Sequence, residues 1–237
     1  MNLKVLLMSM VIAAGGASAA PAAPIARPDA GDLKGEAAAG GSLVFRGIPY
    51  AAPPVGALRW RAPQPVPRWT GQRDATAFGP SCPQNDFPGD ANPLPKPYSE
   101  DCLYLNIWTP PGAPLEAAAK LPVLVSIHGG GLVNGGAAGP VFDGAALARR
   151  GIVVVTLNYR LGRLGFFGHS ALRAAGGDGA DVNFGYLDQI ASLQWVARNI
   201  AAFGGDPARV TIAGESAGGA SVQTLMASPL AQGLFSA

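Results

Sequence analysis

A single serine stands in a pattern that is typical of acyl-transfer chemistry. Residues 210–213 favour a β-strand, residues 214–218 read Gly-Glu-Ser-Ala-Gly, and residues 220–226 can form a helix. A strand that turns at once into a helix holds the turning residue, here Ser216, in a strained backbone conformation at the carboxyl end of the strand. Ser216 would then project its hydroxyl into a cleft, and the amide of Ala217 would open the next helix at the positive end of its dipole. The pattern predicts a serine nucleophile, although a glycine-rich turn with a capping serine has the same form.

A second glycine motif predicts hydrogen-bond donors for the oxyanion that such a nucleophile would create. His128 and three glycines, residues 129–131, directly follow the apolar run 121–127, which is typical of a strand buried on both faces. Residues without side chains let successive amide N–H groups approach a ligand oxygen. This loop and the amide of Ala217 would together form a three-donor oxyanion hole. An ordinary tight turn is the alternative, but two glycine motifs that each directly follow a strand argue against coincidence.

The segments that must position these two motifs alternate between strand and helix patterns. We expect strands over residues 102–108, 121–127, 152–157 and 210–213, with a shorter one at 43–45. We expect helices over residues 143–150 and 184–203. In the second of these, apolar residues recur at spacings of three and four, which makes one apolar stripe. This order is typical of an α/β sheet.

The composition fits one large domain or two small ones. Of the 237 residues, 49% are hydrophobic and 14% are charged, so the chain can bury a sizeable core. The net charge of +2 is small and no basic block stands out, which argues against a nucleic-acid partner.

The start of the chain predicts an export signal followed by a disordered leader. A lysine, a mostly apolar stretch and a small-x-small site form a secretory signal peptide over residues 1–19, with cleavage after Ala19. An uncleaved membrane anchor is the alternative, but the apolar stretch is too short to span a bilayer, and no later stretch is a transmembrane candidate. Residues 20–41 are rich in alanine, proline and glycine and predict disorder. We expect the ordered domain over residues 42–237.

The chain has two cysteines, Cys82 and Cys102. In an exported chain an even pair favours a disulfide, which would stabilise the fold by ~3 kcal/mol by closing the loop between them. Two free thiols are the alternative. No histidine lies near either cysteine in the sequence, which argues against a metal site. The export signal and the cysteine pair together predict a secreted or periplasmic protein.

Five segments of the chain resemble the type-B carboxylesterase family, which includes the cholinesterases. In order they are residues 45–51 (Phe-Arg-Gly-Ile-Pro-Tyr-Ala), 99–103 (Ser-Glu-Asp-Cys-Leu), 128–131 (His-Gly-Gly-Gly), 158–162 (Asn-Tyr-Arg-Leu-Gly) and the block 183–218. The resemblance runs from about residue 42 to the end, and it is most specific where Phe-Gly-Gly-Asp-Pro leads into the serine motif. It implies an α/β-hydrolase fold, here the N-terminal portion of a mostly parallel central sheet flanked by helices.

The resemblance also implies a role for each matching residue. Ser216 matches the acyl-enzyme nucleophile. The amides of Gly130, Gly131 and Ala217 match the oxyanion hole. Glu215 matches a buried carboxylate beside the nucleophile that is not a member of the triad. Three pairings are implied as well: the family's first disulfide, between Cys82 and Cys102, and partly buried ion pairs of Glu100 with Arg46 and of Arg160 with Asp188.

One departure from the family pattern concerns the rest of the catalytic triad. The family's order along the chain is serine, then glutamate or aspartate, then histidine. Residues 217–237, which follow Ser216, contain no acidic residue and no histidine. The only histidines are His128, whose family counterpart is structural, and His169, which has no precedent as a base. We therefore expect the N-terminal part of a carboxylesterase, cut after the nucleophile turn and inactive by itself, because a serine without its base is a weak nucleophile.

The resemblance implies hydrolysis of small-molecule carboxylic esters through an acyl-serine intermediate, with no metal and no cofactor. Two alternatives stay open: a non-catalytic cholinesterase-like binding or adhesion domain, and one half of a split esterase whose acid and histidine belong to a separate chain. An intact Ser216 and glycine loop argue against the binding domain, since binding needs no oxyanion hole. Nothing in the sequence sets the ester or the oligomeric state.

Overall fold

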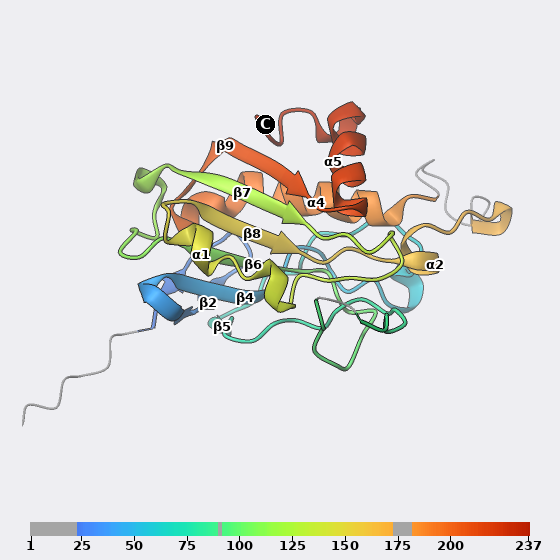
Figure 1. The fold of residues 1–237 in the computed structure, drawn as a ribbon, viewed down its shortest axis with the longest axis horizontal. Coiled ribbons are helices and arrows are strands. Elements are labelled where there is room, and N and C mark those ends of the chain that lie inside the picture. Colours follow the sequence, from blue (N-terminus) through green and yellow to red (C-terminus); the bar gives the residue numbers. More distant parts are fainter. Residues whose placement is uncertain (1–22, 90–91, 173–181) are drawn as a thin grey trace, which may run out of the picture.

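The computed structural model describes residues 23–89, 92–172 and 182–237, so the predicted signal peptide lies outside the described residues. Its main sheet has six strands in the order β3-β4-β6-β8-β7-β9 (Figure 1). The strands are β3 (Glu36–Ala37), β4 (Leu43–Pro49), β6 (Tyr104–Thr109), β8 (Val153–Leu157), β7 (Leu121–Ile127) and β9 (Gly205–Gly214). Pairing is antiparallel from β3 to β8 and parallel from β8 through β7 to β9. The described sheet is mixed, where a mostly parallel one was expected: only β7, β8 and β9, which are joined by long crossovers, pair in parallel.

The longest helix is α4 (Phe184–Asn199), which continues as the 3-10 turn η5 (Ile200–Phe203). Gly204 ends this helix with a left-handed φ of 80°, directly after the predicted range 184–203. The other helices that lie wholly within the described residues are α1 (Ala145–Ala148), α2 (Gly162–Gly165) and α5 (Ala217–Ala227), with 3-10 turns η1 (Ala39–Gly41), η2 (Gly56–Leu58), η3 (Ala117–Ala119), η4 (Pro140–Phe142) and η6 (Pro229–Ala231). Among the described residues, no helix is both long and apolar enough to cross a membrane.

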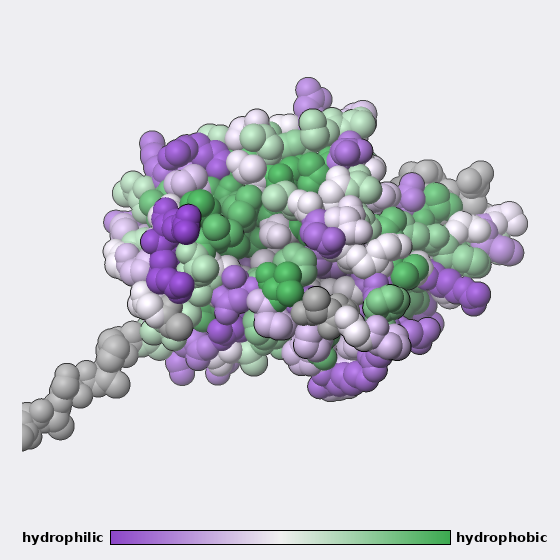
Figure 2. Space-filling model, viewed as in Figure 1, coloured by the Kyte–Doolittle hydropathy of each residue, from purple (hydrophilic) through white to green (hydrophobic). Residues whose placement is uncertain are grey.

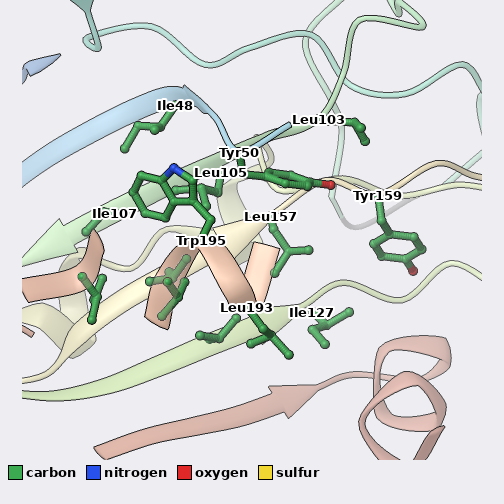
Figure 3. Close-up of a cluster of buried hydrophobic side chains, with 14 of the residues drawn as sticks. Ile48, Tyr50, Leu103, Leu105, Ile107, Ile127, Leu157, Tyr159, Leu193 and Trp195 are labelled. Atoms are coloured by element: carbon green, nitrogen blue, oxygen red, sulfur yellow. The ribbon is translucent and has the colours of Figure 1, made fainter. Parts of the chain in front are cut away.

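Strand β8 lies in the interior of the sheet and shows how its two faces are filled. All five of its residues are buried. Val155 and Leu157 belong to the large core cluster on the face covered by α4, together with Leu193 (Figure 3). Val154 points to the opposite face, where it packs with Trp108 of β6 and with α1. Burial on both faces explains why this strand is a continuous apolar run in the sequence.

Strand β9 carries the serine motif at its end and lies at the edge of the sheet. Val210 and Ile212 are buried, whereas Thr211 between them is exposed. Along the outer edge, the Ser236 amide donates to the Val210 carbonyl at 2.8 Å, and the Ile212 amide donates to the Ala237 carbonyl at 2.8 Å. Apolar surface gathers over β7 and β9 on the face shown in Figure 2. The described residues therefore cover one face of β9 more completely than the other.

The leader that was predicted to be disordered over residues 20–41 is ordered from residue 23 onward. A second sheet in the order β1-β2-β5 joins β1 (Ile25–Ala26), β2 (Asp32–Lys34) and β5 (Gln72–Asp74). Leu33 of β2 is fully buried, and β3 pairs with β4 of the main sheet. The prediction was wrong because composition counts alanine, proline and glycine but not the tertiary contacts that bury the few larger apolar side chains among them.

A disulfide joins Cys82 and Cys102, as predicted, and leaves no free cysteine in the described part of the chain. Both residues are buried. The disulfide closes the loop over residues 82–102, which ends just before β6. The two ends of this loop are therefore held together.

The predicted ion pair of Arg160 with Asp188 is confirmed, and it is buried rather than partly buried. The side chains are 3% and 0% exposed. Asp188 accepts from the Arg160 Nη2, Nε and main-chain N–H groups at 2.7, 2.8 and 3.0 Å. Burial raises the pKa of the Asp188 carboxyl, an effect that Arg160 opposes. The pair fastens the segment after β8 to helix α4.

The predicted pair of Glu100 with Arg46 is wrong. Glu100 accepts two hydrogen bonds from Arg59, at 2.5 and 2.6 Å. Arg46 pairs with Glu36 instead. Strands β3 and β4 are neighbours with Glu36 opposite Val44, two residues from Arg46, so the partner comes from the leader that was expected to be disordered.

Asp188→Ala is expected to destabilise the fold by about 3 kcal/mol or more, because it leaves the Arg160 guanidinium buried without its partner. Urea unfolding followed by tryptophan fluorescence measures the change. Asp86→Ala is the matched control, because Asp86 and its partner Lys96 are exposed, and it should leave the unfolding midpoint unchanged. Equal midpoints for the two variants would contradict the expected role of the buried pair.

Candidate active site

The turn between β9 and α5 holds Ser216 in a backbone conformation that is rare for a residue with a side chain. Its φ is 53° and its ψ is −118°. A conformation of this kind costs about 1–3 kcal/mol and persists only where the surrounding structure enforces it. Ser216 is exposed, and within the described residues its hydroxyl has no hydrogen-bond partner. The strained turn that the sequence predicts is confirmed.

The two glycines of the serine motif are required by close backbone contacts. A Cβ on Gly214 would overlap the carbonyl group of Gly218, and a Cβ on Gly218 would overlap the carbonyl oxygen of Ile127. The end of β9, the start of α5 and the end of β7 therefore pass closer together than side chains permit. This contact explains why glycine stands two residues before and two residues after Ser216.

The glycine loop after β7 lies directly against this turn. Strands β7 and β9 are parallel neighbours with Ile127 opposite Gly214, so both loops leave the sheet at the same edge. A Cβ on Gly129 would lie 3.0 Å from the Ser216 Cβ and 2.7 Å from the Glu215 carbonyl oxygen. The two motifs, far apart in the sequence, thus come into contact.

Three backbone amides of the glycine loop and the serine turn have no acceptor among the described residues. Within the described residues, the N–H groups of Gly130, Gly131 and Ala217 donate to no protein acceptor. The amides of Val133 and Asn134 both donate to the Gly130 carbonyl at 3.0 Å, which shapes the loop into a tight turn. Ala217 is the first residue of α5, where an unpaired amide and the positive end of the helix dipole coincide. Unpaired donors of this kind are what a developing oxyanion requires.

A hollow of about 430 Å³ opens beside the glycine loop. Its wall is formed by Phe87, Asn92, residues 128–131, residues 133–135, Phe142 and Glu215. Ser216 is outside this wall, next to Glu215 at its rim. The lining combines the apolar side chains of Phe87, Val133 and Phe142 with glycine backbone and a few polar side chains, so the hollow suits an apolar group with a few polar contacts.

Glu215 is exposed, and the prediction that it is a buried carboxylate is wrong for this structure. A Cβ on Gly129 would overlap the Glu215 Oε2, which shows that this oxygen lies close to the Gly129 backbone. The carboxylate remains open to solvent because β9 is an edge strand and no described element covers this end of it.

His128 is buried, and its side chain is bonded within the glycine loop and not to Ser216. It is 2% exposed, its Nδ1 lies 2.8 Å from the Gly129 carbonyl oxygen, and its ring stacks on Tyr159 with centroids 4.4 Å apart. The Tyr159 hydroxyl donates to the His128 carbonyl at 2.9 Å. Burial lowers the pKa of His128 to about 4, so the ring is neutral at pH 7. Its contacts make it a structural support for the glycine loop.

Neither histidine of the chain contacts Ser216. His169 is exposed, and its Nδ1 accepts a hydrogen bond from the Ala171 amide at 3.2 Å. In the described ranges, no three histidine, cysteine or acidic side chains are grouped so that they could hold a metal ion. The described residues thus bring together a strained serine and unpaired amides, and neither histidine is hydrogen-bonded to that serine.

Comparison with known proteins identifies the family. A family model described as "Carboxylesterase family" matches residues 22–237. The chain belongs to the carboxylesterase family. The fumonisin B1 esterase of Sphingopyxis macrogoltabida is 48% identical over 191 residues, which cover 81% of this chain and 35% of that protein. The cocaine esterase of Oryctolagus cuniculus is 47% identical over 227 residues, which cover 90% of this chain and 41% of that protein.

Solved carboxylesterase structures share the fold. A PNB esterase superposes with a TM-score of 0.78 at 46% identity, over 89% of this chain and 42% of that one. The carboxylesterase EST55 of Geobacillus stearothermophilus superposes with a TM-score of 0.77 at 46% identity. The expected α/β-hydrolase fold is therefore confirmed. The chain spans about two fifths of the length of these relatives.

The side chains that hold the segment after the glycine motif of this carboxylesterase-family chain were not predicted from the sequence. Gln84 bonds to the backbone of Gly135, and Asn92 bonds to the Gly136 carbonyl and the Val141 amide. Both come from the loop closed by the disulfide. The one available signal was the position of Gln84, two residues after Cys82.

Stability is expected to fall below pH 6.5 through His128. The unfolded chain binds a proton at this residue near pH 6.5, whereas the folded chain resists protonation down to about pH 4. The stabilising contribution of the neutral ring is therefore present above pH 6.5 and is lost as the pH falls toward 4. Between pH 7 and pH 4.5 this loss amounts to about 2 kcal/mol.

Urea unfolding of wild type, His128→Gln and His169→Gln at both pH values measures this effect. The loss should be smaller by that amount in His128→Gln and unchanged in His169→Gln, because His169 is exposed. Parallel pH profiles for wild type and His128→Gln would rule out the expected burial of a neutral imidazole.

Proposed function

We propose that this chain supplies the nucleophile and the oxyanion-binding side of a serine hydrolase that acts on small-molecule carboxylic esters. The observation that carries the proposal is the contact between the strained Ser216 turn and Gly129. The Ser216 hydroxyl, which has no partner among the described residues, thus lies beside a loop in which the amides of Gly130 and Gly131 likewise have no described acceptor. Membership of the carboxylesterase family supports the same chemistry.

In the proposed reaction, the Ser216 Oγ attacks the carbonyl carbon of the ester and loses its proton to a base. The carbonyl oxygen becomes an oxyanion, which accepts hydrogen bonds from the amides of Gly130, Gly131 and Ala217. Collapse of the tetrahedral intermediate expels the alcohol and leaves an acyl-serine, which water then hydrolyses. Removing one donor from such a site costs ~3 kcal/mol of transition-state stabilisation. No step calls on a metal or a cofactor.

The base and its acidic partner are proposed to come from polypeptide outside these 237 residues. The ring of His128 stacks on Tyr159, and the His169 Nδ1 accepts a hydrogen bond from the Ala171 amide. Without a base Ser216 stays a weak nucleophile. The chain by itself is therefore proposed to react once with an activated ester or phosphonate but not to turn over esters at the rate of a complete enzyme.

The ester substrate is proposed only as a class. The names of the relatives refer to fumonisin B1, cocaine and phenmedipham. Each of these proteins is 47–48% identical to this chain, yet their names refer to different compounds. Sequence identity over the matched residues therefore does not indicate one particular substrate.

Export is proposed from the predicted signal over residues 1–19 and from the disulfide between Cys82 and Cys102. A disulfide persists in an oxidising compartment, which favours the periplasm or the outside of the cell. Expression in a bacterial host followed by mass spectrometry of the exported chain should show cleavage after Ala19. A chain retained in the cytoplasm with an intact N-terminus would contradict export.

Labelling with a fluorophosphonate probe tests the nucleophile. The purified chain should be modified slowly and only at Ser216, and Ser216→Ala should abolish the label, because the probe reacts with a hydroxyl that faces oxyanion donors. Ser228→Ala, at the other end of α5, is the matched control and should label like the wild type. Peptide mass spectrometry identifies the modified residue.

Two outcomes would contradict the proposal. A folded chain that is not labelled at Ser216 at any probe concentration would favour a non-catalytic binding domain. Continuous hydrolysis of p-nitrophenyl esters at the rate of a complete carboxylesterase would show that this chain already holds a base.

A further inference from the structure

The segment that follows the glycine motif has little regular structure of its own. Between the end of β7 at Ile127 and the turn η4 at Pro140, the chain forms neither a strand nor a helix. Side-chain carboxamides hold it in place. Ala137 is bonded through its amide to Asn158 Oδ1 at 2.9 Å and through its carbonyl to Asn106 Nδ2 at 3.3 Å. These bonds fix the far end of the segment but not its middle.

Gln84 fixes the middle of the segment through two reciprocal bonds to Gly135. The Gln84 Nε2 donates to the Gly135 carbonyl at 2.8 Å, and the Gly135 amide donates to the Gln84 Oε1 at 2.7 Å. Both polar groups of one side chain are thus paired with both polar groups of one backbone residue. This two-point contact restrains the orientation of Gly135 as well as its position.

Gly135 in turn supports the start of the glycine loop. Its φ is 107°, and a Cβ at this position would lie 2.5 Å from both the Gly129 carbonyl oxygen and the His128 Nδ1. Gly135 therefore packs directly on the backbone of Gly129, which lies against Ser216 on its other side. A displacement of Gly135 would move Gly129 and the amides that follow it.

Gln84 is itself held before it reaches Gly135. It follows the buried, disulfide-bonded Cys82 by two residues, and its Nε2 also donates to the Cys82 carbonyl at 3.1 Å. The carboxamide thus projects from a fixed point and loses little conformational freedom when it binds the loop.

We propose that Gln84 is a positioning residue for the oxyanion loop, and that it couples the disulfide-closed loop over 82–102 to the amides of Gly130 and Gly131. The proposal rests on the function proposed above for those amides. Gln84 touches no reacting atom, and it acts by holding Gly135 against Gly129. The disulfide therefore has a local role at the site in addition to its general contribution to the fold.

Hydrogen–deuterium exchange of the 237-residue chain tests this coupling without requiring activity. Gln84→Met keeps the length of the side chain but removes both bonds to Gly135, together with the bond to the Cys82 carbonyl. Exchange at the amides of residues 133–137 should become about tenfold faster, since two hydrogen bonds are lost, and exchange in β7, β8 and α4 should not change. Gln84→Glu keeps the acceptor for the Gly135 amide and should restore part of the protection. Gln64→Met is the matched control, because Gln64 is exposed and, within the described part of the chain, its side chain bonds only to the Ala62 carbonyl.

Unchanged exchange at residues 133–137 in Gln84→Met would overturn the proposal. Faster exchange throughout the sheet would overturn it as well, because that pattern reports a general loss of stability. The rate of fluorophosphonate labelling at Ser216, measured on the same samples, should fall about tenfold or more in Gln84→Met and not in Gln64→Met. If the wild type is not labelled at all while the local exchange effect is present, the proposed function fails and the coupling of Gln84 to the loop stands.

Discussion

The close approach of the ends of β7 and β9 is the constraint on which the site depends. Parallel pairing places Ile127 opposite Gly214, and the backbone beyond each residue must then turn in a space too small for side chains. Glycine at 129, 214 and 218 makes this possible. The same crowding forces Ser216 into its strained conformation, so the exposed position of its hydroxyl follows from backbone packing and not from any contact of the hydroxyl itself.

Strain at one residue persists only when the structure around it is rigid, and two different kinds of support provide that rigidity. The serine turn rests on the buried core, in which β7, β8 and α4 pack with fully buried side chains and the Arg160–Asp188 pair ties α4 to the segment after β8. The glycine loop rests on polar contacts instead, because a loop cannot satisfy its backbone groups within itself. Carboxamides from elsewhere in the chain and the buried ring of His128 fulfil this role.

Patterns that arise from neighbouring residues were predicted from the sequence. The long helix, its glycine stop, the buried strands and the strained turn at Ser216 depend on local spacing, which the sequence displays directly. Pairings between distant residues were predicted less well. Arg46 bonds to Glu36 because two strands are neighbours in the sheet, and residue types cannot reveal this neighbour. The exposure of Glu215 depends on β9 being an edge strand, and the contact of Gln84 with Gly135 depends on how two loops cross.

By itself the sequence determined the family, through a serine between two glycines and a second glycine loop, and it limited the histidines of these 237 residues to His128 and His169. The tertiary structure decided which atoms meet. It brought Gly129 into contact with Ser216, buried the His128 ring in a stack with Tyr159, and paired the Gln84 side chain with the Gly135 backbone. The physical reason is that glycine spacing reports the local backbone conformations that a chain permits, whereas burial and hydrogen bonding between segments arise only when the sheet brings those segments together.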